Sequence, residues 1–301
     1  MFGPTAAGKT GVAIEVADRL RRRGEDPVAV NCDAIQVYRG LEVLSGAASE
    51  AERNRLEHRL LAIVAIDGEF SAGRFATLAH AEVDQLVASG RRPIVVGGTG
   101  LYLRAALSDL DLRPPVPGAI RAAVEAELAE RGPGALHDEL DPDLAATVHP
   151  KDRKRIARLT ELARAGIDPP RSSERLWAEA LRHPTVLVGL TLERDELDRR
   201  IDARVGAMLA AGAAEEARAA DAAGASRTAR AAIGFEELLR GDVEAIKAAQ
   251  RRYARRQLTW MRKMRGVRLV DRAGRSDAEV AGAVVALLDS AERDAGRGGL
   301  E

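Results

Sequence analysis

The chain begins with residue types that suit the binding of a phosphate group. It opens MFGPTAAGKTG, and residues 3–10 fill every fixed position of the pattern G-x-x-x-x-G-K-[ST]. In such a loop, backbone N–H groups approach phosphate oxygens, Lys9 neutralises their charge and the Thr10 hydroxyl can bind Mg²⁺. We therefore predict a phosphate site, with Thr10 as magnesium ligand, made of Gly3, Pro4, Thr5, Ala6, Ala7, Gly8, Lys9 and Thr10.

Two further polar residues follow apolar segments that are typical of strands. Asp33 ends the segment PVAVNCD (27–33), and Thr99 lies in a glycine-rich turn after a second segment, 93–97. Because parallel strands place their carboxyl ends at one edge of a sheet, both side chains are expected in the crevice beside the phosphate-binding loop. An aspartate there can hold magnesium through water, accept a proton from a nucleophile, or merely cap a helix.

The order of the segments predicts an α/β fold. A helix follows the loop and ends near Gly24, strand 27–33 comes next, and 60–66 reads as a strand or an extended segment. A helix with Ser71 as its N-cap then leads to strand 93–97. This βαβαβ order indicates a mainly parallel sheet flanked by helices, of the P-loop NTPase type, over residues 1–111.

The pattern changes at about Leu112. The proline-rich segment LRPPVPG is followed by residues that lack any strand pattern and predict three helices, over 119–132, 134–148 and 150–166. We therefore expect an all-helical insertion domain at 112–183. Strand 184–190 returns the chain to the sheet, and the rest of the core, 184–290, is expected to be helical, with a disordered tail at 291–301.

The composition limits the possible classes of protein. Forty-six basic and 46 acidic residues cancel, so only local patches can attract a polyanion. The single cysteine, Cys32, excludes an internal disulfide and any Cys-rich zinc cluster. No apolar run approaches the roughly 18–20 residues that span a bilayer. These features favour the reducing cytoplasm and predict no membrane association.

Two basic segments stand out. The first is KDRKRIAR (151–158), within the expected insertion. The second is QRRYARRQLTWMRKMR (250–265), in which Tyr253 and Trp260 are interleaved with positive charge. Such a combination suits a nucleic-acid backbone and stacked bases. A solvated helical face in an arginine-rich chain explains each segment about equally well.

Taken together, several segments identify a family. GPTAAGKT, CDAIQVYRGL, EHRLL with FSAGRF, PIVVGGTGLYLRA, RRIDARVGAMLAAG, AIGFEEL and RYARRQLTWMRK follow one another along the chain. This order resembles that of the tRNA dimethylallyltransferases, also called tRNA isopentenyltransferases, from Phe2 to about Arg265. The resemblance implies transfer of a dimethylallyl group from its diphosphate to the exocyclic amine of the adenosine 3′-adjacent to the anticodon.

The resemblance also implies roles for individual residues. The loop holds the diphosphate leaving group with Mg²⁺, and the catalytic residues are Asp33 as general base, Thr99 and Lys9. The anticodon stem-loop of tRNA is contacted by Asp33, Ala34, Ile35, Gln36, Thr99, Arg121, Lys154, Arg155, Ile156, Ala157 and Arg158. A bacterial-type enzyme that acts as a monomer, without an obligate protein partner, is expected.

The chain departs from the family pattern at three places. The lysine that usually follows the second motif is absent after Gly40, and the usual His-His-Leu is reduced to His58. Only Met1 and Phe2 precede the loop, where relatives have several apolar residues. Either the true start lies further upstream or, if this short form is the native one, we expect a weakly supported loop and low stability. Two other classes remain open: a small-molecule kinase that uses ATP, and a nucleotide-switch or RNA-binding protein without transfer chemistry.

Overall fold

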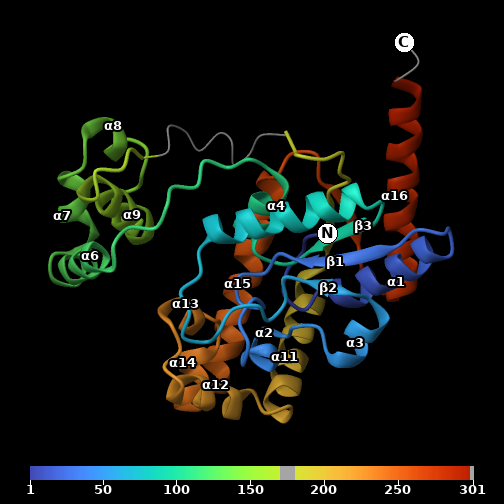
Figure 1. The fold of residues 1–301 in the computed structure, drawn as a ribbon. Helices are drawn as coiled ribbons and strands as arrows, with labels where there is room; N and C mark the ends of the chain where they lie inside the picture. The colour runs from blue at the N-terminus through green and yellow to red at the C-terminus, as the bar shows by residue number, and fades with distance from the viewer. Residues whose placement is uncertain (170–179, 299–301) are drawn as a thin grey trace. The chain divides into compact units, whose positions relative to one another are not determined.

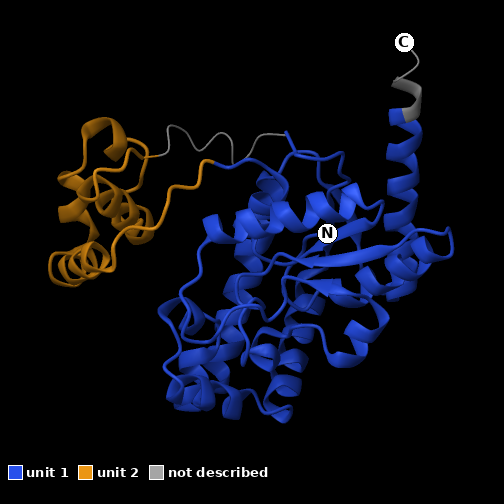
Figure 2. Cartoon of the chain, viewed as in Figure 1, with its two compact units in different colours: residues 1–110, 176–301 blue, residues 111–175 orange. Residues whose placement is uncertain are grey.

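The computed structural model describes residues 1–169 and 180–298. The chain forms two compact units, residues 1–110 with 176–301 and residues 111–175 (Figure 2). Of the insertion expected at 112–183, residues 170–179 lie outside the described residues. Residues 180–183 belong to the first unit, because Arg182 donates its backbone N–H to Leu107 and forms an ion pair with Asp84 at 2.7 Å. The predicted end of the insertion at 183 is therefore corrected.

The first unit is an α/β structure, as its sequence predicted (Figure 1). Its strands are β1 (Pro27–Asn31), β2 (His58–Arg59), β3 (Arg92–Val96), β4 (Val188–Thr191) and β5 (Arg268–Asp271). Before the insertion its helices are α1 (Lys9–Arg21), α2 (Glu42–Ser45), α3 (Glu50–Arg55), α4 (Ala72–Ala88) and α5 (Gly100–Leu107). After it they are α11 (Arg194–Ala210), α12 (Ala213–Ala222), α13 (Arg227–Arg230), α14 (Phe235–Arg240), α15 (Val243–Lys263) and α16 (Asp277–Gly298).

The two residues before the phosphate-binding loop join the sheet. Strands β2, β1 and β3 pair in parallel in that order, and β4 pairs in parallel with β5. Phe2 forms parallel bridges to both Gly97 and Gly189, and exchanges backbone hydrogen bonds of 2.8 Å with Val188 and Leu190. Phe2 thus connects the two sets of strands into one parallel sheet at the position that leads into the loop.

Helices cover both faces of this sheet. Apolar residues of α1 and α16 pack against Val188, Leu190 and Val270 on one face. On β4, Gly189 faces the other way because side chains alternate along a strand, and a Cβ there would lie 2.5 Å from the Met261 sulfur of α15. Helix α4 packs against β1 and β3 (Figure 1). Apolar side chains therefore pack against both faces of the sheet that supports the loop.

Three local expectations for the first unit are corrected. The segment 60–66 is not a strand, because Leu60 and Ala62 have positive φ, 59° and 51°, and only Val64 forms an isolated bridge, to Tyr38. Strand β5 lies where only helices were expected, since four residues are too few for a periodic pattern. Helix α16 extends to Gly298, so most of the segment 291–301 is helical; residues 299–301 lie outside the described residues.

In the second unit, the described residues 111–169 form helices and connecting segments without a strand, as the sequence predicted. Its described helices are α6 (Gly118–Glu130), α7 (Gly132–Asp138), α8 (Pro142–Ala145) and α9 (Arg153–Arg164). The segment expected as one helix over 134–148 is divided between α7 and α8, and Pro142 begins α8 with Asp141 as its N-cap. The core of the unit is made of Val124, Leu128, Leu136, Val148 and Ile156.

Replacing Phe2 by alanine tests how far this residue supports the sheet. Its side chain is 2% exposed, so we expect Phe2→Ala to lower the free energy of unfolding by about 3–5 kcal/mol. Val87→Ala on α4, where the side chain is 41% exposed, is the control and should change it by less than about 0.5 kcal/mol. Chemical denaturation measures the free energy of unfolding of both variants. Equally small effects would show that the Phe2 side chain contributes little to stability.

Candidate active site

The phosphate-binding loop has a backbone that only a few residue types adopt easily. Gly8, the N-cap of α1, has φ 73°, and Ala6 has φ 63° although it carries a Cβ. A left-handed alanine costs on the order of 1 kcal/mol, and such residues gather at ligand-binding loops. The Lys9 ammonium donates to the Gly3 and Pro4 carbonyls at 3.2 and 2.9 Å, which ties it to the start of the loop.

Asp33 and Thr99 meet at the carboxyl edge of the sheet. The Asp33 Oδ1 accepts from the Ile35 N–H at 3.0 Å, and its Oδ2 lies 3.5 Å from the Thr99 hydroxyl. Thr99 Oγ1 also accepts the Ala34 N–H at 3.2 Å. Asp33 therefore stabilises its own turn with one oxygen and directs the other toward Thr99. The alternative of a helix-capping aspartate does not apply, because Asp33 is not the N-cap of a described helix.

Two half-buried cations share the electrostatic environment of Asp33. Burial lowers the pKa of Lys9 to about 8, and the Asp33 carboxylate partly opposes this shift, whereas Arg204 of α11 adds to it. Burial also lowers the pKa of Arg204, and Asp33 again opposes the shift. Arg204 donates to the Ser45 carbonyl at 3.0 Å, while its buried Nε has no hydrogen-bond partner among the described residues. An anion would stabilise this pair of cations.

Helix α15 contributes two polar side chains to the same edge. Gln257 bonds both the Thr5 N–H and the Gly98 carbonyl, at 2.7 and 2.8 Å. The Tyr253 hydroxyl lies 3.3 Å from both the Gly98 carbonyl and Thr99 Oγ1. Burial raises the pKa of Tyr253 well above its usual range, so its phenol is neutral and can donate.

Comparison with known proteins places the chain in a family. A family model described as IPP transferase matches residues 36–264. The chain belongs to the IPP transferase family. A protein named tRNA dimethylallyltransferase from Anaeromyxobacter dehalogenans (strain 2CP-C) is 44% identical over 281 residues, 88% of this chain and 91% of that protein. Another of this name, from Parvibaculum lavamentivorans, is 42% identical over 274 residues, 86% of each.

A solved structure agrees with this assignment. The full-length tRNA isopentenylpyrophosphate transferase from Bacillus halodurans is 30% identical and matches with a TM-score of 0.67, over 97% of this chain and 96% of that one. The family resemblance and the P-loop-like α/β fold predicted from the sequence are thus confirmed. The names of the relatives favour prenyl transfer to tRNA over the small-molecule kinase.

Within this family member, the structure brings together the predicted residues of the first unit. The loop, Asp33 and Thr99 are joined by the contacts above, and Ala34, Ile35 and Gln36 continue the turn after Asp33 and are half-buried. Gln36 donates to the Gly46 carbonyl at 3.2 Å. The proposed roles of these residues stay predictions.

The predicted tRNA-binding residues of the second unit differ in exposure: some side chains are exposed, and others are buried or form ion pairs. Lys154 and Arg155 are exposed at the start of α9. Ile156 is fully buried in the core of its unit, so its side chain supports that core, and its predicted contact with tRNA stays a prediction. Glu161 forms ion pairs with Arg158 at 3.3 Å and with Arg121 at 3.9 Å. Ala157 lies beside the same core.

The basic segment 250–265 has two faces on α15. On one face, the Tyr253 hydroxyl lies 3.3 Å from Thr99 Oγ1, and Arg251 forms an ion pair with Asp202 at 2.5 Å. The other face carries a groove of about 440 Å³. Its lining residues are Arg252, Arg255, Arg256, Thr259 and Trp260.

The described residues include no helix long and apolar enough to cross a membrane.

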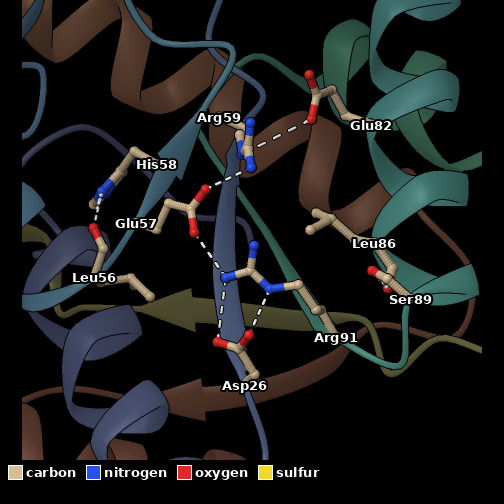
Figure 3. Close-up of polar contacts among 9 residues, drawn as sticks. All are labelled: Asp26, Leu56, Glu57, His58, Arg59, Glu82, Leu86, Ser89 and Arg91. Carbon is tan, nitrogen blue, oxygen red and sulfur yellow. Dashed lines mark hydrogen bonds and ion pairs between the residues drawn. The ribbon is translucent and has the colours of Figure 1, made fainter.

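His58 is the one histidine that remains of a family motif. It lies in β2 and takes no part in the site contacts described above. Its Nδ1 lies 2.7 Å from the Leu56 carbonyl, and burial lowers the pKa of its imidazole (Figure 3). Around it runs a chain of ion pairs made of Asp26, Arg91, Glu57, Arg59 and Glu82. We assign His58 to the support of this edge of the sheet.

Arg204 and Gln257 were not predicted as site residues, although the sequence holds a signal for each. On α11, Leu197, Ile201, Val205 and Met208 are buried, and Arg204 adjoins this apolar stripe. On α15, Gln257 occupies the buried stripe that contains Ala254 and Met261. A polar residue on an apolar helix face needs a buried partner, and that need marks it as a candidate.

Proposed function

We propose that the chain transfers a dimethylallyl group from dimethylallyl diphosphate to the exocyclic amine of the adenosine 3′-adjacent to the anticodon of tRNA. The observation that carries the proposal is the grouping of Asp33 with two half-buried cations, Lys9 and Arg204, at a phosphate-binding loop. This arrangement supplies an acceptor for a proton and a site for a leaving anion. The enzyme acts in the cytoplasm, as a monomer.

The leaving group defines the role of the loop. An aromatic amine is a weak nucleophile because its lone pair is delocalised into the ring, so the allylic C–O bond must break readily. The electron pair of that bond leaves with the diphosphate, whose charge Lys9, Arg204 and the loop N–H groups stabilise. Partial burial strengthens these interactions because little water competes for the same oxygens.

Asp33 acts at the other side of the transferred carbon. Its carboxylate binds the amine, the amine nitrogen bonds to the allylic carbon, and Asp33 takes the proton that nitrogen loses. Thr99 lies against Oδ2 and keeps that oxygen directed into the crevice. With a base on one side of the allylic carbon and an anion site on the other, the amine can displace the diphosphate directly.

The oxygen ligands that the loop offers suit a magnesium ion that binds together with the diphosphate of the substrate. No group of three or more His, Cys, Asp or Glu side chains that could hold a metal occurs within 1–169 and 180–298. Mg²⁺ is usually bound by one or two protein oxygens together with phosphate oxygens. Thr10, in the first turn of α1, and the diphosphate would supply such ligands, and the bound ion would neutralise charge on the leaving group.

Recognition of tRNA is assigned to basic residues of each unit. In the second unit these are Arg121, Lys154 and Arg155; in the first, the groove on α15 has exposed arginines and an indole, which suit phosphates and a stacked base. The target adenosine must leave the stack of the anticodon loop to reach Asp33, which costs a few kcal/mol.

Changing the groove should alter tRNA binding selectively. We expect Arg255→Gln with Arg256→Gln to weaken tRNA binding and to reduce the salt dependence of log Kd by about 1 for each phosphate that is no longer neutralised. Binding of magnesium diphosphate should not change. The control Arg218→Gln removes an exposed arginine of α12 that is paired with Glu215. Titrations at several salt concentrations measure the slope, and an unchanged slope would exclude the groove as a binding surface for phosphates.

One assay tests the proposed function. Purified protein is mixed with Mg²⁺, dimethylallyl diphosphate and unmodified tRNA, and prenylated adenosine and released diphosphate are quantified. We expect both products in equal amounts. A parallel reaction with ATP and no prenyl donor tests the kinase alternative. Consumption of ATP without any prenylated adenosine in the first reaction would refute the proposal.

A further inference from the structure

Gln257 is a buried polar side chain on a mainly apolar face of α15. It is 3% exposed, and the other buried residues of this helix are Ile246, Gln250, Ala254 and Met261. An amide at such a position is unfavourable unless its donor and acceptor both find partners. The partners of Gln257 therefore explain why an amide stands there.

Both partners belong to the site rather than to the helix. The Oε1 atom accepts the Thr5 N–H at 2.7 Å, and the Nε2 atom donates to the Gly98 carbonyl at 2.8 Å. Because one partner is a donor and the other an acceptor, only one orientation of the amide satisfies both. A single side chain thus bridges the phosphate-binding loop and the glycine-rich turn.

The turn is held tightly against this amide. A Cβ at Gly98 would overlap Gln257 Nε2, so the backbone approaches the amide as closely as glycine permits. The Tyr253 hydroxyl reaches the same carbonyl at 3.3 Å from one helical turn earlier. The next residue of the turn is Thr99, which contacts Asp33. The contacts run without interruption from the loop to the carboxylate.

We propose that Gln257 is a positioning residue that fixes the spacing between the loop that binds the diphosphate and the turn that orients Asp33. The inference rests on the proposed function, because the spacing matters only if a leaving group at the loop and a base at Asp33 act on one carbon. A displacement of about 1 Å between reacting groups can cost on the order of 100-fold in rate.

The first test compares two buried glutamines of α15. Gln257→Met keeps a similar shape but removes both hydrogen bonds; Gln250→Met, about two turns earlier at a side chain 5% exposed, is the matched control. We expect Gln257→Met to lower kcat about 10- to 100-fold and to weaken the binding of magnesium diphosphate about 3- to 10-fold, with KM for tRNA unchanged. Gln250→Met should lower the melting temperature without these changes.

The second test separates positioning from mere structural support. In Gln257→Glu, one carboxyl oxygen still accepts the Thr5 N–H, but only the protonated acid can donate to the Gly98 carbonyl. We therefore expect the activity of Gln257→Glu relative to the wild type to rise as the pH is lowered. Lys9, Asp33, Arg204 and Tyr253, the charged and titratable groups of the site, are present in both proteins, so the ratio isolates the new carboxyl group.

The outcomes distinguish this inference from the proposed function. Equal kcat and diphosphate affinity in Gln257→Met and wild type would overturn the inference, as would a pH-independent activity ratio for Gln257→Glu. The binding of magnesium diphosphate, measured by calorimetry, does not depend on prenyl transfer. It therefore tests the role of Gln257 at the loop even if the wild type forms no prenylated adenosine. That last result would refute the proposed function alone.

Discussion

Asp33→Asn should lower kcat for dimethylallyl transfer by about 10²- to 10⁴-fold, the usual contribution of a general base. Asparagine keeps an oxygen for the Ile35 N–H, which Asp33 Oδ1 accepts at 3.0 Å, so the turn should persist. The amide cannot take the proton that the amine loses. Single-turnover measurements with saturating tRNA and dimethylallyl diphosphate report this step directly.

The controls for Asp33→Asn address fold and charge separately. Asp109→Asn removes a carboxylate that is 74% exposed and paired with Arg182, and it should leave kcat within about twofold of the wild type. Binding of tRNA to Asp33→Asn is measured independently, to show that the loss lies in the chemical step. A wild-type rate for Asp33→Asn would rule out Asp33 as the base.

Lys9→Met should lower kcat by about 10²- to 10³-fold, because a positioned donor to the developing charge of the diphosphate is removed. Lys9→Arg should restore little, since a planar guanidinium does not reproduce a compact ammonium within the loop. Affinity for magnesium diphosphate should fall in parallel. Retention of both kcat and diphosphate affinity in Lys9→Met would remove Lys9 from the mechanism.

The pH dependence supplies a second readout for Lys9. Its pKa in the free protein is about 8, so raising the pH above this value removes its positive charge. We expect the affinity of the wild type for magnesium diphosphate to fall as the pH rises through about 8. Lys9→Met has no charge to lose there and should lack this step, so the same step in both proteins would assign it to another group.

Local sequence patterns predicted much of this protein. The phosphate-binding loop depends on contiguous residues, and strands β1 and β3 are short apolar runs ended by Asp33 and the glycine-rich turn. Ser71 caps α4 as expected, because a cap needs only its own helix: it accepts the Arg74 N–H. The order of such segments indicated the family, which the comparisons confirm.

Contacts between distant parts of the chain were decided only by the tertiary structure. Gln257 meets Thr5 across 252 positions, and Arg204 meets Ser45 across 159. Phe2 forms a one-residue strand because β3 and β4 lie on either side of it, and β5 is a strand only because β4 pairs with it. The sequence by itself determined the phosphate-binding loop and Asp33, since their geometry follows from neighbouring backbone dihedrals. Their spacing was not determined in this way, because it depends on which distant helix the folded core brings to that edge.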